Sequence, residues 1–329
     1  MTILNFPSRT RSRLRLGTRG SQLATTQSSW VAGQLTSPDH TVELTAIATL
    51  GDRSDRPIEQ LGGTGVFVTA LRTALLRGEV DVIVHSYKDL PAAPEPGIRL
   101  AAIPVREDPR DALICRTADD LTDLPDGALI GTGSPRRSAQ LLAKGLPLRF
   151  APLRGNVDTR LAKLADGAVD ALILARAGLA RLGRLDVITS ILDPDLMLPA
   201  PAQGALAVEC RADDDETAAA LSAVDDAITR TEVTAERAFL GTLNGGCTAP
   251  VGALATLTGS TLRLDACVAA PDGSELLRRT ASASATDAER LGRDLALALI
   301  QEGATELLDR PAPAAVDPRT APNAKGARR

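Results

Sequence analysis

The chain has 329 residues, of which 44% are hydrophobic and 24% charged, and its net charge is −4. At about 150 residues per domain, this length predicts two or three domains. The composition is that of a globular protein and argues against a disordered, collagen-like or coiled-coil chain. The acidic balance also argues against a general nucleic-acid-binding protein, so no nucleic-acid partner is expected.

Arginine is the unusual feature of the charge pattern. The chain has 37 lysines and arginines, and only four of them are lysines. Codon bias in the genome is the simplest explanation for most of these arginines. The informative question is therefore which of them the fold places where a ligand binds.

The sequence gives no sign of a membrane segment, a secretory signal or a metal site. No run reaches the ~18 consecutive apolar residues that a membrane-spanning helix needs. The basic residues between Met1 and Arg15 are not followed by an apolar segment, so no signal peptide is expected. The four cysteines form no CxxC pair, and the two histidines are His40 and His85. These features predict reduced thiols, no zinc and a cytoplasmic protein.

The first two-thirds of the chain alternate apolar runs with helical patterns, as is typical of a parallel α/β sheet. Strands are expected at Leu14–Gly17, Val42–Thr49, Val80–His85, Leu100–Val105, Ala128–Gly131 and Ala171–Ala175. Helices are expected at Ser21–Leu35, Val66–Leu76, Arg136–Ala143 and Val157–Leu164. The runs GTRGS and GEVD are followed, in the same order, by GTGS and GAVD. This weak internal echo predicts two lobes of similar build.

From about residue 227 the pattern changes to that of a small α+β unit. A helix at Glu232–Leu243 is followed by Asn244-Gly245-Gly246, which suits a helix C-cap. A hairpin turn is expected at Asp272-Gly273, a closing helix at Asp287–Leu308, and a disordered tail at Arg310–Arg329. The strands of the antiparallel sheet are expected at Val251–Leu257, Thr261–Ala269 and Ser274–Ala283.

Polar residues that directly follow the predicted strands are the candidate site residues, because ligands of open α/β sheets gather beyond the C-terminal strand ends. The run that ends in His85 is followed by Ser86, Lys88 and Asp89. A carboxylate beside a lysine can stay ionised, stabilise a cation and exchange a proton. The alternative is a solvated turn with a local ion pair. His85 itself lies on the apolar side of the run and is expected to be a core residue.

Basic residues recur in four such loops and predict an anionic ligand. Besides Lys88, they are Arg19 after the first strand, the pair in Gly131–Arg137, and the two arginines of Leu153–Arg160. Helix starts attract anions, and arginine binds carboxylates in a bidentate manner. The expected ligand carries several carboxylates or phosphates and lies at one C-terminal sheet edge. The alternative is ordinary helix caps with surface arginines, and no Walker A or GxGxxG run indicates a nucleotide cofactor.

One cysteine differs from the other three in its surroundings. Cys247 lies in the run NGGCTAP between a predicted helix and a predicted strand, and is expected to be accessible. Cys115, Cys210 and Cys267 fall in apolar runs and are expected to be small buried side chains. A lone cysteine is usually structural, but one on a Gly-Gly loop is a candidate nucleophile or attachment point.

Six segments, in order, resemble the porphobilinogen deaminase (hydroxymethylbilane synthase) family, and the resemblance runs from about Leu14 to Leu308. The segments are HSYKDLP, REDPRDAL, GTGSPRRSAQL, LRGNVDTRL, PAPAQGALAVECR and AERAFLGTLNGGCTAPVG. Each alone could arise by chance, whereas six in order make coincidence very improbable. The resemblance implies a transferase of porphyrin (heme) biosynthesis that condenses four porphobilinogen molecules, with loss of ammonia, into the linear tetrapyrrole hydroxymethylbilane.

The family resemblance also implies an architecture. It predicts two periplasmic-binding-protein-like, doubly wound α/β lobes and a small α+β domain with an antiparallel sheet that carries the cysteine. The implied boundaries are 14–106 with 200–222 for the first lobe, 107–199 for the second lobe and 227–309 for the third domain. A monomer is expected.

The resemblance further implies the roles of individual residues. The primer is a dipyrromethane cofactor held by a thioether to Cys247, and the acidic catalytic residue is Asp89, which would stabilise the cationic azafulvene intermediate. The implied cofactor-binding residues, besides Cys247, are Ser86, Lys88, Thr132, Ser134, Arg136, Arg137 and Arg160. The implied substrate-binding residues are Arg19, Gln27, Phe67, Arg154 and Arg181.

The chain departs from the family pattern at three positions. Many members have lysine where this chain has Gln60 and Thr64, and Pro135 replaces a more usual apolar residue. Asp89, Cys247 and the principal arginines are intact, which favours an active enzyme. The rival interpretation is a non-catalytic binding protein of the same two-lobe architecture for an anionic metabolite. The absence of a recognisable signal sequence and the presence of Cys247 argue against that rival.

Overall fold

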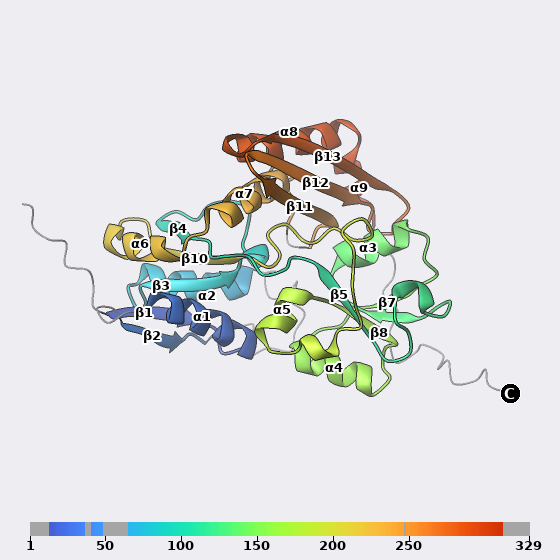
Figure 1. The fold of residues 1–329 in the computed structure, drawn as a ribbon, viewed down its shortest axis with the longest axis horizontal. Coiled ribbons are helices and arrows are strands. Elements are labelled where there is room, and N and C mark those ends of the chain that lie inside the picture. The colour runs from blue at the N-terminus through green and yellow to red at the C-terminus, as the bar shows by residue number, and fades with distance from the viewer. Residues whose placement is uncertain (1–12, 37–40, 49–64, 247, 312–329) are drawn as a thin grey trace, which may run out of the picture. The chain divides into compact units, whose positions relative to one another are not determined.

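A computed structural model describes residues 13–36, 41–48, 65–246 and 248–311 (Figure 1). Its strands form two five-stranded sheets and one three-stranded sheet. The chain divides into two compact units, Met1–Glu107 with Ala205–Arg230 and Asp108–Gly204 with Thr231–Arg329. The second unit contains both the second five-stranded sheet and the three-stranded sheet, so the predicted three-domain boundaries stay a prediction. The predicted disordered tail lies outside the described residues beyond position 311.

The sheet of the first unit has the strand order β2-β1-β3-β10-β4. Strands β1, β2 and β3 are parallel, whereas β10 runs antiparallel to both β3 and β4. Helices α1 and α6 pack on one face and α2 on the other, because apolar side chains alternate between the faces of β3. The elements are β1 (Arg13–Thr18), α1 (Gln22–Leu35), β2 (Thr41–Ala46), α2 (Gly65–Leu76), β3 (Val82–Ser86), β4 (Ile98–Ala102), β10 (Leu206–Arg211) and α6 (Asp215–Leu221).

The second five-stranded sheet repeats this topology with the order β7-β6-β8-β5-β9. Here β6, β7 and β8 are parallel, and β5 is the strand inserted antiparallel between β8 and β9. Helix α3 packs on one face, and α4 and α5 pack on the other. The repeat confirms two lobes of similar build. The elements are β5 (Asp111–Cys115), β6 (Leu129–Gly131), α3 (Pro135–Ala143), β7 (Arg149–Ala151), α4 (Val157–Ala165), β8 (Ala171–Ala175), α5 (Arg176–Arg181) and β9 (Ser190–Ile191).

The three-stranded sheet is antiparallel, as predicted, and helices cover one face of it (Figure 1). Its outer strand β11 has an edge whose N–H groups are capped. Ala253 donates to Pro199 O at 3.0 Å, Ala255 to Glu236 Oε1 at 2.8 Å, and Leu257 to Glu232 Oε1 at 3.1 Å. A capped edge does not template further strands. The elements are α7 (Ala227–Thr242), β11 (Val251–Thr258), β12 (Thr261–Ala269), β13 (Leu276–Ser284), α8 (Ala288–Gln301) and α9 (Ala304–Leu308).

The fold class is confirmed, but three details differ from the sequence-based predictions. Each large sheet is mixed, because β5 and β10 are antiparallel insertions that the apolar pattern did not reveal. Each inserted strand carries a buried carboxylate, Asp111 at the first position of β5 and Glu209 inside β10. Helix α7 starts earlier than expected. The predicted closing helix is two helices, separated where Gly303 adopts φ +99°.

The inserted strand β10 explains the environment of His85. Glu209 accepts hydrogen bonds from Arg72 Nε at 3.1 Å and Nη2 at 2.6 Å. Arg72, His85 and Glu209 are all buried. His85 Nε2 lies 3.5 Å from Glu209 Oε2. His85 is therefore a core residue of the first lobe, as predicted.

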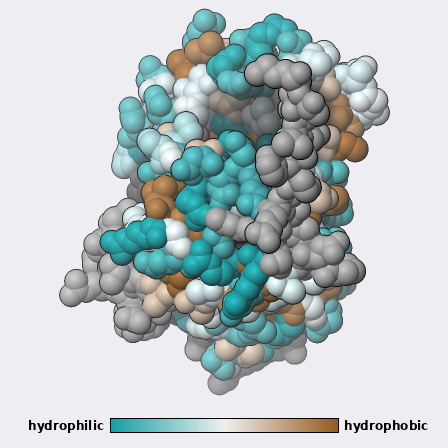
Figure 2. Space-filling model, turned by 90° about the vertical axis from the view of Figure 1, so that its left-hand side faces the viewer, coloured by the Kyte–Doolittle hydropathy of each residue, from teal (hydrophilic) through white to brown (hydrophobic). Residues whose placement is uncertain are grey.

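The surface is that of an ordinary folded protein on the face that Figure 2 shows. Hydrophilic residues dominate the described atoms there, and hydrophobic ones lie in small separate groups (Figure 2). Scattered apolar residues of this kind need no special explanation. No helix in the described ranges is both long and apolar enough to cross a bilayer.

Candidate functional site

The first group of predicted site residues lies at the C-terminal ends of two neighbouring strands in the first unit. Strands β1 and β3 are parallel and paired, so the loops that follow Thr18 and Ser86 share one sheet edge. Arg19 follows β1. Lys88 and Asp89 lie in a short 3-10 turn, Tyr87–Asp89, directly after β3. Asp89 is exposed and Lys88 is half-buried, and the two are adjacent on this turn.

Gln27 fixes the hydroxyl group of Ser86. Gln27 lies on α1 and is 4% exposed, and its Nε2 donates to Ser86 Oγ at 2.9 Å. A serine hydroxyl that accepts one hydrogen bond can still donate its own hydrogen to a ligand. The structure therefore brings together Ser86 and Gln27, which the family resemblance had assigned to cofactor and substrate respectively.

The opposite end of β3 carries a structural ion cluster. Asp81 accepts hydrogen bonds from Arg15 Nη2 at 2.9 Å and Arg211 Nη2 at 3.1 Å. Burial alone would raise the pKa of Asp81, but the hydrogen bonds from Arg15 and Arg211 lower it to about 2. Arg15 and Arg211 are therefore already paired with Asp81 at the start of β3. They are distinct from the basic residues that follow the C-terminal strand ends.

The second group begins at the exit of β6 in the second unit. Thr132 is 5% exposed, and its Oγ1 accepts a hydrogen bond from Ser134 N at 3.2 Å. Ser134 is the N-cap of α3, and its side chain makes no capping bond within the described structure. Pro135 occupies the first turn of α3, where a missing N–H costs nothing. The departure at position 135 therefore fits the helix start.

Arg136 and Arg137 are buried against one carboxylate rather than exposed at the helix start. Asp111 accepts from Arg136 Nη2 at 2.7 Å, and from Arg137 Nη2 at 2.8 Å. Gln203 Nε2 also donates to Asp111, at 2.8 Å. We call these four residues the Asp111 cluster. Burial would raise the pKa of Asp111, but the two guanidinium groups hold it well below its usual range.

The Asp111 cluster leaves one buried donor unused. Arg136 is 3% exposed, and its Nη1 donates to Leu198 O at 2.5 Å. Its Nε has no hydrogen-bond partner among the described residues. Because a buried donor without an acceptor is costly, this N–H suits a ligand oxygen. All three guanidinium nitrogens of Arg137, in contrast, donate to protein atoms.

Arg160 is a second side chain of the second unit that is suited to binding an anion. It lies on α4, and its Nε donates to Gly155 O at 3.0 Å. No described carboxylate lies within ion-pair distance of it. Burial, and then the nearby charge of Arg137, lower the pKa of Arg160 to about 10. A carboxylate bound at Arg160 would reverse both effects.

The remaining predicted arginines of the second unit follow two further strands. Arg154 is exposed in the loop after β7, and Arg181 ends α5, which follows β8. Arg181 Nη2 donates to Gly204 O at 2.6 Å. The sequence predicted one sheet edge for all the basic loops. This is wrong, because Arg19 and Lys88 follow strands of the first sheet, whereas the other arginines follow strands of the second.

The charges of the second unit favour an anion with more than one carboxylate. In the Asp111 cluster, two arginines share one aspartate, and Arg160 adds another cation. These three arginines and Asp111 together have a surplus of two positive charges, and Arg136 and Arg137 are buried. Paired carboxylates would offset this surplus, and arginine is the side chain best suited to binding them.

One predicted site residue, Cys247, lies outside the described residues, as do Gln60 and Thr64, two of the departures from the family pattern. For Phe67 only the backbone, within α2, is described. Burial raises the pKa of the Cys210 and Cys267 thiols to about 11, so both are poor nucleophiles. Cys115 is half-buried, which corrects the prediction that all three are buried.

Sequence reasoning assigned no role to three buried residues that organise this site. Asp111 and Gln203 belong to the segments REDPRDAL and PAPAQGALAVECR, and Gln140 belongs to GTGSPRRSAQL. They are 0%, 1% and 2% exposed. Their presence in these segments was a usable signal, but their partners are far away in sequence.

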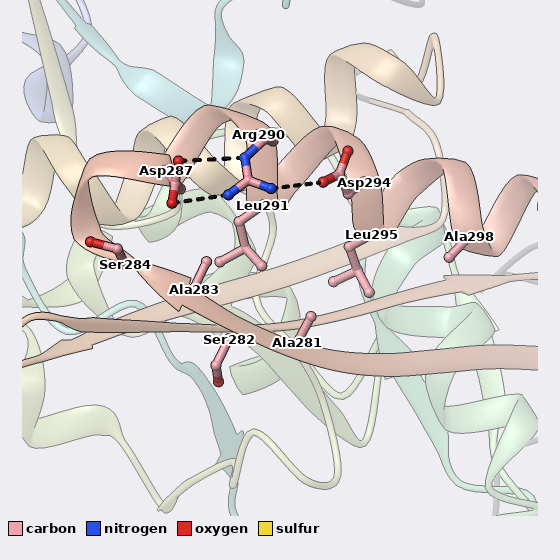
Figure 3. A pocket seen from close by; sticks show the side chains of 10 residues that line it. All are labelled: Ala281, Ser282, Ala283, Ser284, Asp287, Arg290, Leu291, Asp294, Leu295 and Ala298. Atoms are coloured by element: carbon pink, nitrogen blue, oxygen red, sulfur yellow. Dashed lines mark hydrogen bonds and ion pairs between the residues drawn. The ribbon is translucent and has the colours of Figure 1, made fainter.

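A groove of about 480 Å³ lies elsewhere, between β13 and α8 of the three-stranded domain (Figure 3). Small and apolar side chains line it, including Ala283 and Leu295. On its rim, Arg290 lies between Asp287 and Asp294, at 3.0 and 3.9 Å. These charges satisfy one another and none of the predicted site residues lines the groove, so it is not the candidate active site.

Comparisons with known proteins identify the family of this chain. A family model described as "Porphobilinogen deaminase, dipyromethane cofactor binding domain" matches residues 14–219. One described as "Porphobilinogen deaminase, C-terminal domain" matches residues 230–301. Among solved structures, the methionine-binding protein MetQ covers 65% of this chain and 88% of its own, at 12% identity and a TM-score of 0.42. This last likeness is too low to carry weight.

Curated relatives extend over nearly the whole chain. The porphobilinogen deaminase of Mycobacterium marinum is 54% identical over 304 residues, which is 90% of this chain and 96% of that protein. The porphobilinogen deaminase of Mycobacterium tuberculosis is also 54% identical, over 90% of this chain and 98% of that protein. With a family model that matches well over half of its residues, this chain belongs to the porphobilinogen deaminase family.

Proposed function

We propose that this chain is a hydroxymethylbilane synthase. It joins four porphobilinogen molecules head to tail, and each condensation forms one carbon–carbon bond and releases one ammonia. Hydrolysis then frees the linear tetrapyrrole hydroxymethylbilane. The observation that carries this proposal is the surplus of two positive charges around the Asp111 cluster and Arg160, in a chain of this family. Each pyrrole of the substrate bears an acetate and a propionate, so the growing product accumulates negative charge.

The residues of the second unit fit a covalent dipyrromethane. Bound through a thioether to Cys247, that group supplies the primer onto which new rings are added. Arg136 Nε is a buried donor without a protein acceptor, and Arg160 is a partly buried cation without a described carboxylate. Both are suited to hold carboxylates of the cofactor, whose binding residues we propose to be Ser86, Lys88, Thr132, Ser134, Arg136, Arg137, Arg160 and Cys247.

Asp89 is the catalytic residue in this proposal. Its carboxylate lies on the turn after β3, next to Lys88, in an exposed position. There it can accept a hydrogen bond from a pyrrole N–H and stabilise positive charge as ammonia departs. It can also move a proton to or from the reacting carbon. Ser86, oriented by Gln27, offers a hydroxyl beside it.

The substrate is held by residues outside the cofactor set, three of them arginines. We assign this role to Arg19, Gln27, Phe67, Arg154 and Arg181. Arg19 and Arg154 lie at strand exits, where incoming carboxylates can pair with them. The proposal further places the protein in the cytoplasm as a monomer, with porphobilinogen as its partner.

The first test is the mass of the purified chain. We expect active protein to carry the added mass of a dipyrromethane and the Cys247→Ser variant to lack it. Incubation with porphobilinogen should then add a ladder of equal increments, each equal to porphobilinogen minus ammonia. A binding protein for an anionic metabolite would show no covalent increment. Active protein with only the bare polypeptide mass would contradict the proposal.

The second test is Arg160→Ala. Removing this cation should lower kcat/KM by about 10- to 100-fold, because a buried carboxylate loses its partner. The cofactor-free chain should be slightly stabilised, because the repulsion between Arg160 and Arg137 disappears. Steady-state kinetics of Arg160→Ala in the otherwise wild-type chain measure the first effect, and thermal unfolding of Arg160→Ala in a Cys247→Ser background measures the second. Arg184→Ala, which breaks a surface pair with Asp158, is the control and should change neither. Unchanged kcat/KM in Arg160→Ala would remove Arg160 from the site.

A further inference from the structure

In the second unit, a glutamine side chain holds the backbone N–H and C=O groups of one buried residue. Gln140 on α3 accepts a hydrogen bond from Leu198 N at 2.9 Å, through Oε1, and donates from Nε2 to Leu198 O at 3.0 Å. Arg136 Nη1, one helical turn earlier, donates to the same carbonyl. Gln140 is 2% exposed and Leu198 0%. Water therefore cannot replace these bonds, and each is costly to lose.

The same stretch of chain contacts strand β11 on its other side. Pro199 O accepts a hydrogen bond from Ala253 N at 3.0 Å. A Cβ placed at Gly252 would lie 2.8 Å from Leu198 Cβ and 3.1 Å from Leu198 O. Only glycine allows β11 to approach this closely. We call residues 198–199 the 198–199 segment; it is clamped between α3 and β11.

Of the two elements that this segment joins, α3 carries proposed cofactor-binding residues, and β11 follows the proposed attachment residue in the sequence. The first turn of α3 carries Arg136 and follows Ser134. Strand β11 begins at Val251, four residues after Cys247. We propose that Gln140 is a positioning residue: it fixes the 198–199 segment as a spacer that sets the cofactor's attachment loop against the side chains that hold its carboxylates. This inference rests on the proposed function.

The chemistry of position 140 explains why glutamine suits this role. An amide offers a donor and an acceptor side by side, which matches the N–H and C=O of one extended residue. Glutamate keeps the acceptor for Leu198 N but loses the donor, while Leu198 O keeps Arg136. Methionine has a similar length and neither group. Comparing the two substitutions therefore distinguishes the effect of losing the hydrogen bond from Leu198 N–H from the effect of side-chain volume.

The experiment compares Gln140→Met and Gln140→Glu with Ile114→Val, a core substitution in the same unit whose hydrophobic cluster contains no residue of α3 or of the 198–199 segment. Ile114 is 3% exposed in the β5 core. The primary readout is the fraction of purified chain that carries the covalent cofactor, by intact mass. Thermal unfolding is measured in a Cys247→Ser background, so that cofactor loss does not affect it. kcat and KM are measured on all variants.

We expect Gln140→Met to reduce the loaded fraction at least about fivefold and to lower kcat with KM changed less than twofold. Gln140→Glu should lie between Gln140→Met and the wild type. Ile114→Val should stay fully loaded despite its loss of stability. The inference is overturned if Gln140→Met, or, where that variant does not fold, Gln140→Glu, is as fully loaded as Ile114→Val. A wild-type chain without any added mass would instead contradict the proposed function itself.

Discussion

Asp89→Asn should lower kcat by at least about 100-fold, which is the usual contribution of a positioned acid or base. The substitution removes the negative charge and the proton-accepting capacity while it nearly preserves the volume. Because Asp89 is exposed on a short turn after β3, its replacement should leave the fold intact. Steady-state kinetics with porphobilinogen measure the first effect, and thermal unfolding measures the second.

The matched control is Asp213→Asn, which changes another exposed aspartate of the first unit. It should retain the wild-type kcat. The intact mass of Asp89→Asn also matters, because a loaded but inactive variant separates catalysis from cofactor attachment. A loaded Asp89→Asn variant with the wild-type rate would exclude Asp89 from the mechanism.

Asp111→Asn should produce the largest loss of stability of any single isosteric change considered for this chain. All four groups that surround Asp111 in its cluster are donors from Arg136, Arg137 and Gln203. An asparagine amide would place its own donor against one of them and leave two buried cations without a counter-ion. Breaking a buried pair in this way costs about 3–5 kcal/mol. The melting temperature should fall by roughly 10 °C.

The stability difference between Asp111→Asn and the wild type should depend on pH. The pKa of Asp111 is lowered in the folded protein. Its stabilising effect is therefore full above the unfolded-state pKa of about 3.9 and is lost as the pH falls further. Denaturant unfolding should show a large difference in the free energy of unfolding between the wild type and Asp111→Asn at neutral pH. Near pH 3 this difference should be smaller.

Asp195→Asn is the control for Asp111→Asn. Asp195 pairs with Arg278 at 3.2 Å, but its side chain is 96% exposed. Exposed pairs of this kind contribute at most about 1 kcal/mol. If Asp111→Asn were no less stable than Asp195→Asn at neutral pH, the Asp111 cluster would not be a stabilising unit of the second lobe.

The arginines illustrate how far sequence reasoning reached. Their position after apolar runs predicted basic side chains at strand exits, and the structure confirms this placement for Arg19 and Arg154. The same pattern could not tell a ligand-binding arginine from one that a buried aspartate already occupies. Arg136 and Arg137 are 25 and 26 residues away from Asp111, and no periodicity links them.

The inserted strands show the same limit in the fold. β5 and β10 were not predicted; each is a short strand with a buried carboxylate, Asp111 at the first position of β5 and Glu209 inside β10. Both carboxylates are buried and paired with arginines from helices of the same lobe. Pairing offsets part of the cost of burying a charge, but only after the chain has folded.

The α/β class, the small antiparallel sheet, the family and the candidate residues could all be predicted from the sequence, because local periodicity and ordered motifs encode these. The chain is rich in arginine yet acidic overall, and the roles of its arginines depend on the tertiary structure. The structure shows which arginines are neutralised by buried aspartates. It also shows that Arg136 Nε and Arg160 have no carboxylate partner among the described residues. Ion pairing and burial depend on distances between segments far apart in the chain, and a one-dimensional pattern does not contain those distances.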